Sequence, residues 1–288
     1  MSEKMSDRIK TREWPLAIFT LTVQFACGAA LATTVYSTVA TMRPLGIAVF
    51  PAVAVGMLAS LLHLGRPLSA GRSLSNLRHS RLSREVFVTS LFAASALAYS
   101  ATWFGGWVEW RFALGIATSA LGFAAVIASA MIYTVRSQPV WNSGWVPGSF
   151  LGATLLLGAS PALLMGLGTQ GLAHQRALLG MIVAGSLLLS VSIVWMLIHV
   201  SRTRAERADS VTSEFSPYQF TARLGITAAS SIVLAGILPI VLICINSLAA
   251  ASLSGMVPYS AWILAVIVLG TALGRMSMYE VQAGQQKF

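Results

Sequence analysis

Eight runs of about 20 or more mostly apolar residues divide this chain of 288 residues. A helical run of that length crosses the ~30 Å hydrocarbon core of a bilayer. Backbone groups inside lipid must be hydrogen-bonded within the protein, and a helix achieves this by itself. The sequence therefore predicts an all-α integral membrane protein with eight transmembrane helices. The predicted spans are residues 15–41, 45–64, 85–104, 112–135, 149–168, 177–199, 224–248 and 260–279.

The segments between these runs are too short to form a soluble domain. The longest polar stretches are residues 1–14, 65–84 and 200–223, and none of them can bury a core. The run at 15–41 is longer than the apolar part of a signal peptide, so we interpret it as the first span. We expect one transmembrane domain over residues 1–288, whose order of spans is compatible with two four-helix bundles divided near Trp141–Pro147.

The basic residues are distributed unequally between the two sides of the membrane. The net charge is +10, but the charges lie in short loops between apolar runs, which indicates membrane orientation and not nucleic-acid binding. Sixteen Lys and Arg residues fall on one side and three on the other, namely Arg43, Arg111 and Arg176. Under the positive-inside rule, this split predicts that both termini are cytoplasmic.

The residues of this chain do not form a pattern typical of a metal or haem site. Cys27 and Cys244 lie inside apolar runs and there is no CxxC motif, so we expect no iron–sulfur cluster or zinc site in this chain. His63 and His199 end spans on the same side and could in principle ligate haem, but neither lies deep within a span. We expect no haem, because histidines at helix ends usually cap the helix or face the interface.

His63 and Glu85 are the strongest candidates for chemistry. His63 closes the second span and Glu85 opens the third, so both lie at the same membrane depth if the two helices are neighbours. An imidazole beside a carboxylate at the bilayer edge suits quinone chemistry, because each two-electron step moves two protons. The alternative is that His63 caps a helix end and Glu85 merely starts a helix. Likewise, Gln24 is by default an interhelical hydrogen-bonding residue and Trp14 part of an aromatic belt.

Several short motifs resemble those of the membrane anchor subunit of the DMSO reductase family. The resemblance covers essentially the whole chain, with matching number and order of spans. Its most specific part is His63-Leu64-Gly65-Arg66-Pro67, followed about twenty residues later by Ser83-Arg84-Glu85. The other matching segments are Glu13-Trp14-Pro15-Leu16, Gln24, Tyr133, Pro139…Trp141…Trp145-Val146-Pro147 and Gly274-Arg275.

This resemblance implies a partner complex and a cofactor. Anchors of this family bind a molybdopterin catalytic subunit and a four-cluster iron–sulfur subunit, carry no haem, and exchange electrons with ubiquinone or menaquinone in a bacterial inner membrane. The anchor is not catalytic by itself. The family's quinol-binding histidine and glutamate match His63 and Glu85, and we expect Arg66, Gln24 and Trp14 to support the quinone.

The predicted orientation selects among the members of this group. The name-giving DMSO reductases hold their catalytic subunits on the periplasmic side, whereas a related group of sulfite dehydrogenases uses a similar anchor that faces the cytoplasm. The charge split therefore favours electron transfer from sulfite to quinone. The alternatives are a DMSO reductase anchor that oxidises quinol and an inert docking anchor. A secondary transporter is disfavoured, because it would place ionisable groups near the midplane and this chain has almost none there.

The connection between the second and third spans is unusually basic. It carries five arginines, more than orientation requires. We expect Arg72, Arg78 and Arg81 to dock the iron–sulfur subunit, and the alternative is that this basic face contacts anionic lipid headgroups.

Overall fold

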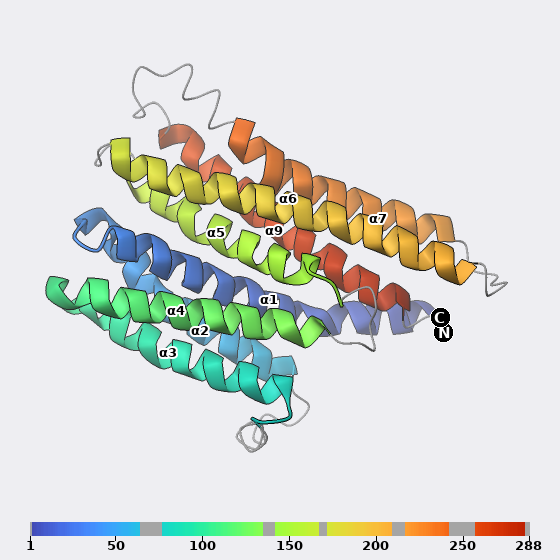
Figure 1. Ribbon diagram of the computed structural model, residues 1–288, viewed down its shortest axis with the longest axis horizontal. Helices are drawn as coiled ribbons and strands as arrows, with labels where there is room; N and C mark the ends of the chain where they lie inside the picture. Colours follow the sequence, from blue (N-terminus) through green and yellow to red (C-terminus); the bar gives the residue numbers. More distant parts are fainter. Residues whose placement is uncertain are drawn as a thin grey trace.

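The described part of the protein consists of helices that run back and forth along one long axis (Figure 1). The computed structural model describes residues 2–63, 77–134, 142–166, 172–208, 217–241 and 257–285. Within these ranges there are eight α-helices and two short helical segments of other types. The helices are α1 (Ser2–Val35), α2 (Arg43–His63), α3 (Arg81–Gly105), α4 (Val108–Tyr133), α5 (Trp145–Gly166), α6 (Leu172–Ala208), α7 (Pro217–Ser231) and α9 (Val257–Gln285).

The helices form two neighbouring groups. α1 to α4 lie together in the lower part of Figure 1, and α5, α6, α7 and α9 lie together in the upper part. α1 packs against α2, α4 and α5, and α5 in turn packs against α6 and α9. α1 and α5 therefore form the seam between the two groups. The beginning of α1 and the end of α9 lie at the same end of the molecule (Figure 1).

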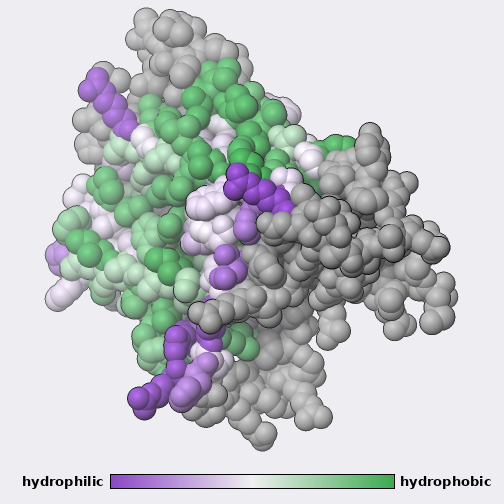
Figure 2. Space-filling view, turned by 45° about the vertical axis from the view of Figure 1, so that its right-hand side comes forward, coloured by the Kyte–Doolittle hydropathy of each residue, from purple (hydrophilic) through white to green (hydrophobic). Residues whose placement is uncertain are grey.

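The surface of these helices is that of a multi-pass membrane protein. Large aliphatic side chains face outward, among them Leu58 with 63% of its surface exposed and Ile226 with 67%. Figure 2 shows broad apolar areas with few hydrophilic residues among the described ones. Seven of the described helices are long and apolar enough to cross a membrane, and the apolar part of α9, Leu264–Tyr279, is shorter.

Most predicted spans agree within a few residues with the apolar, membrane-spanning parts of the described helices. The end of the predicted span 224–248 lies outside the described residues, and the first predicted span is wrong at its end. The sequence predicts a helix up to residue 41, whereas α1 ends at Val35. A turn follows in which Val39 donates to the carbonyl of Tyr36 at 2.9 Å, and the 3₁₀ helix η1 (Ala40–Met42) leads into α2. Tyr36 and Met42 are buried, so the turn is as apolar as a helix and hydropathy alone does not reveal it.

Glycines let α1 and α5 approach each other closely. A Cβ atom on Gly158 would lie 2.0 Å from the carbonyl carbon of Gly28, and one on Gly28 would lie 2.0 Å from the carbonyl oxygen of Thr154. Such close contact between backbones stabilises helix association within lipid.

The π-helical segment η3 (Ile232–Ile237) follows α7 directly. Two serines bond to the backbone around it. Ser186 of α6 donates to the carbonyl of Ala235 at 3.0 Å, and Ser231 donates to the carbonyl of Gly270 in α9 at 2.7 Å. These bonds tie α6, η3 and α9 together where the regular helical pattern is interrupted.

Candidate functional site

Glu85 lies inside the bundle, one turn into α3. The helix begins at Arg81, and Ser80 is its N-cap, whose hydroxyl accepts from the backbone N–H of Ser83 at 3.2 Å. Glu85 is only 7% exposed, and its Oε1 accepts a hydrogen bond from Ser129 Oγ of α4 at 2.5 Å. The alternative that Glu85 starts the helix is therefore wrong. Its carboxyl group is instead a buried polar group that joins α3 to α4.

One turn further along α4, a second polar pair joins α4 to α9. The hydroxyl groups of Tyr133 and Tyr279 are 3.2 Å apart. Their rings lie against each other with centroids 6.3 Å apart, and Tyr133 also packs on Phe150 of α5. Both tyrosines are buried, so the two hydroxyl groups are shielded from the surface of the bundle.

One turn back along α9 from Tyr279, a third pair joins α9 to α1. Arg275 is 4% exposed, and its Nη2 donates to Oε1 of Gln24 at 3.0 Å. The guanidinium lies 3.7 Å above the ring of Phe150, and Nη1 contacts Sδ of Met278 at 3.5 Å. Gln24 is 1% exposed, so the default interpretation of Gln24 as an interhelical hydrogen-bonding residue is confirmed.

Together the three pairs form a polar ladder through the bundle. It comprises the pairs Glu85–Ser129, Tyr133–Tyr279 and Arg275–Gln24. Ser129 and Tyr133 are four residues apart on α4, and Arg275 and Tyr279 are four residues apart on α9. In each helix this spacing places the two side chains on the same face. Tyr133 lies in the electrostatic field of both Glu85 and Arg275. The ladder thus has a carboxyl group at one end and a guanidinium near the other, with two phenols between them.

The ladder extends well into the membrane. Gln24 lies ten residues after Trp14 on α1, roughly 15 Å along the helix axis, which is about half of the hydrocarbon thickness. The expectation of almost no ionisable group near the midplane is corrected here, because Arg275 reaches this depth. The count of Lys and Arg residues on the two sides of the membrane instead assigns Arg275 to the cytoplasmic side. An arginine inside the apolar segment Leu264–Tyr279 was the signal for a buried site.

The Arg275–Gln24 end of this ladder is incompletely hydrogen-bonded. Nε of Arg275 and Nε2 of Gln24 are buried without a partner. Among the side chains that the structure describes, the groups around Arg275 are phenols, an amide, a thioether and a phenyl ring, and no carboxylate pairs with it. A buried charge with so few partners is costly and typically marks a functional site.

The other predicted site residues are placed differently. Trp14 is 48% exposed, as is typical of an interfacial tryptophan, and the structure does not bring it into the ladder. His63 is the last residue of α2, and its side chain lies outside the described residues, as does all of Arg66. The approach of His63 to Glu85 therefore stays a prediction, which the packing of α2 on α3 allows.

The predicted docking arginines separate into different roles. The guanidinium of Arg81 donates to the carbonyl of Met131 at 2.6 Å and to that of Thr134, so it closes the C-terminal end of α4. Arg84 similarly holds the turn before α3 through the carbonyls of Leu77 and Arg78. Arg78 is exposed, and Arg72 lies outside the described residues. Part of the apparent excess of arginines in this connection is therefore explained by capping of backbone carbonyls.

Comparison with known proteins finds several chains that are similar in sequence. The protein is 30% identical over 170 residues to the anaerobic dimethyl sulfoxide reductase chain YnfH of Escherichia coli, which covers 51% of this chain and 55% of that one. It is also 30% identical over 167 residues to another anaerobic dimethyl sulfoxide reductase chain of the same organism, covering 51% and 54%. A sulfite dehydrogenase subunit of Allochromatium vinosum is 37% identical over 109 residues, covering 33% and 34%.

The chain thus spans about half the length, or less, of these curated relatives. The family of DMSO reductase anchor subunits (DmsC) matches over a much longer stretch, residues 9–281. That stretch includes every residue of the polar ladder. The chain therefore belongs to the DMSO reductase anchor subunit (DmsC) family of multi-pass membrane proteins.

Proposed function

We propose that this protein is the quinone-reactive anchor of a membrane-bound molybdoenzyme. The observation that carries the proposal is Glu85, a buried carboxyl group one turn into α3 that forms the first of three polar pairs inside the bundle. Quinone reduction or quinol oxidation moves two protons per two electrons, and a shielded carboxyl group near the membrane edge can accept and release them. His63 shares this proton transfer, while Arg66 and Gln24 orient the ring oxygens.

The proposed partners follow from the family to which the chain belongs. A quinone needs an electron donor or acceptor, which in this family is an iron–sulfur subunit joined to a molybdopterin catalytic subunit. The exposed Arg78, together with Arg72, docks the iron–sulfur subunit near Glu85. In this arrangement electrons pass directly between the nearest cluster and the quinone ring.

The orientation of the anchor determines which reaction it serves. We place α9 in the membrane as the eighth span with both termini in the cytoplasm, supported by the charge split, which is still 15 to 3 without the buried Arg275, and by the shared end of α1 and α9 in Figure 1. A catalytic subunit in the cytoplasm favours sulfite as the electron source, in line with the similarity to a subunit of a sulfite dehydrogenase. A quinol-oxidising DMSO reductase anchor is the second candidate, favoured by the similarity to two dimethyl sulfoxide reductase chains.

Two other functions are less well supported. The buried Arg275 weakens the argument against a transporter, because it places a charge deep in the bundle, but the match to an anchor family favours the anchor. An inert docking anchor would use the basic loop and leave the ladder without a chemical role.

Substitution of Glu85 by Gln tests the proposal. The amide keeps the shape of the side chain and removes the proton-accepting carboxyl group. In the purified complex we expect quinone binding to persist, while turnover coupled to quinone falls by roughly 10²-fold or more, the usual contribution of a positioned acid or base. Substitution of both His63 and Glu85 should abolish turnover coupled to quinone.

Glu109→Gln is the matched control, since Glu109 is an exposed carboxylate at the other end of α4, and its turnover should equal that of the wild type. Wild-type turnover in the Glu85 variant as well would mean that the anchor is inert.

A further inference from the structure

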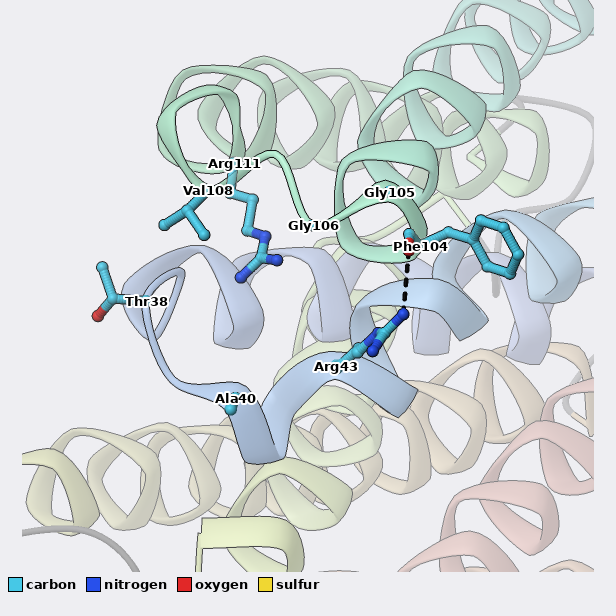
Figure 3. A pocket seen from close by; sticks show the side chains of 8 residues that line it. All are labelled: Thr38, Ala40, Arg43, Phe104, Gly105, Gly106, Val108 and Arg111. Atoms are coloured by element: carbon cyan, nitrogen blue, oxygen red, sulfur yellow. Dashed lines mark hydrogen bonds between the residues drawn. The ribbon is translucent and has the colours of Figure 1, made fainter.

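A pocket of about 480 Å³ opens at the end of the molecule opposite Glu85 (Figure 3). It lies between the connection from α1 to α2 and the connection from α3 to α4. Its lining includes Thr38, Ala40 and Arg43 from the first connection, and Phe104, Gly106 and Arg111 from the second. Two of the three basic residues on the sparsely charged side, Arg43 and Arg111, therefore meet in one place although they are far apart in the sequence.

Both arginines are held in place by backbone carbonyls at helix ends. Arg43 Nη2 donates to the carbonyl of Phe104 at 3.0 Å, which Figure 3 shows as a dashed line. Arg111 Nη1 donates to the carbonyl of Ser37 at 3.2 Å. Arg111 is only 6% exposed, and its guanidinium lies 4.2 Å from the centre of the Trp103 ring. Each guanidinium is thus oriented by one bond and retains further N–H groups for a ligand.

The charges at this pocket are not balanced by the protein. Arg43 and Arg111 lie in each other's electrostatic field, and the exposed Glu109 is the carboxylate that also acts on Arg111. Nε of Arg111 is buried without a partner. Two guanidinium groups against one exposed carboxylate leave an excess of positive charge that an anion would offset.

The N-terminus of α4 adds to this positive potential. Trp107, the residue at its N-cap, makes no side-chain capping bond. The N-cap side chain therefore does not occupy the N–H groups of the first turn, and the helix dipole favours an anion there. Gly106, with φ of 78°, turns the chain into this position, and no atom lies within 4 Å of where its Cβ would be. Val108 of the first turn lines the same pocket.

We propose that this pocket binds the phosphate group of an anionic phospholipid headgroup in the leaflet opposite the quinone site. A phosphate diester carries one negative charge and offers two free oxygens, which suit two guanidinium groups that approach from different loops. The apolar side chains of Phe104, Trp107 and Trp110 are 73%, 54% and 59% exposed around this end of the bundle. Aromatic side chains in such positions are typical of the headgroup level of a membrane, so the pocket opens where lipid phosphates are most concentrated.

Native mass spectrometry of the full-length protein in detergent tests the proposal. The wild-type protein should retain one phosphatidylglycerol molecule in preference to phosphatidylcholine. Substitution of the exposed Arg43 by Gln should weaken that binding roughly tenfold, the effect of losing one charge-assisted contact. Because Arg111 is buried, Arg111→Lys is the appropriate second variant, and it should also weaken binding while the protein remains folded.

Arg176→Gln is the matched control, since Arg176 is an exposed arginine on the same side but outside this pocket. It should retain phosphatidylglycerol as the wild type does, and Glu109→Gln should bind it more tightly. Equal retention in the wild type and the Arg43 variant would overturn the proposal. If inorganic phosphate alone binds as well as phosphatidylglycerol does, and the binding depends equally on Arg43, the assignment of a lipid is overturned, because the ligand would then be a free anion.

Discussion

Tyr133 holds the central position in the polar ladder. Its hydroxyl meets that of Tyr279, and its phenol lies between the opposite charges of Glu85 and Arg275. A phenol can both donate and accept a proton, whereas Arg275 stays protonated and Gln24 does not titrate. We therefore expect a proton that moves between Arg275 and Glu85 to pass through the tyrosine pair, and we expect Arg275 to stabilise negative charge on these hydroxyl groups.

Tyr133→Phe separates this role from simple packing. The phenylalanine ring keeps the contact with Phe150, while the hydroxyl group is lost. We expect turnover coupled to quinone to fall about tenfold or more, with about 1 kcal/mol less stability from the lost hydrogen bond.

Tyr99→Phe is the control for this variant, because Tyr99 is also buried and donates to Thr33 Oγ1 of α1 at 2.9 Å, away from the ladder. It should lose similar stability and keep full turnover. Equal turnover in both variants would show that the hydroxyl of Tyr133 is structural.

At the scale of whole helices, the crossing of α1 and α5 depends on the absence of side chains. In lipid there is no strong hydrophobic force between helices, so close backbone contact supplies much of the association. At Gly28 and Gly158 the two backbones are so close that a Cβ atom would overlap main-chain atoms. Since α1 carries Gln24 and α5 carries Phe150, this crossing also positions Arg275.

Gly158→Ala should therefore destabilise the protein although alanine favours helices. The added methyl group must push α1 away from α5, which overpacks the contact and costs roughly 1–3 kcal/mol. Gly180→Ala in α6 is the control, because nothing lies within 4 Å of its Cβ position, and it should be neutral or up to about 1 kcal/mol stabilising. Thermal unfolding of the two variants in the same detergent measures the difference. Equal melting temperatures would contradict the packing argument.

Over the whole molecule, hydropathy predicts the helices far better than the contacts between them. The apolar runs locate each span because the bilayer imposes length and composition. They do not predict that Ser129 bonds to Glu85 or that Tyr133 meets Tyr279, since a serine or tyrosine in an apolar helix has the same pattern wherever it faces. The second of these contacts joins residues 146 positions apart, and only the packing of α4 on α9 determines it.

Arg78 is the described residue on which docking of the partner subunits is best tested. It is exposed, whereas Arg81 is occupied at the end of α4. Arg78→Glu should release the iron–sulfur and catalytic subunits at lower salt than the wild-type complex requires, because attraction becomes repulsion at the interface. Size-exclusion chromatography over a salt series measures the release. Arg176→Glu makes the same charge change on the opposite side and should leave the complex intact. If both variants copurify with their partners equally well, the basic loop contacts lipid instead.

The orientation of the bundle decides between cytoplasmic and periplasmic partners, and two exposed positions at its opposite ends report it. Cys27 and Cys244 are first replaced by Ala, and then Arg78→Cys or Trp107→Cys introduces a single thiol at one end or the other. With both termini in the cytoplasm, a membrane-impermeant maleimide added to intact spheroplasts should label the Trp107 variant, and the Arg78 variant only after permeabilisation. The reason is the charge split, since the loop that carries Arg78 holds five arginines and the Trp107 end far fewer basic residues. Labelling of the Arg78 variant in intact spheroplasts would reverse the orientation and favour the quinol-oxidising DMSO reductase arrangement.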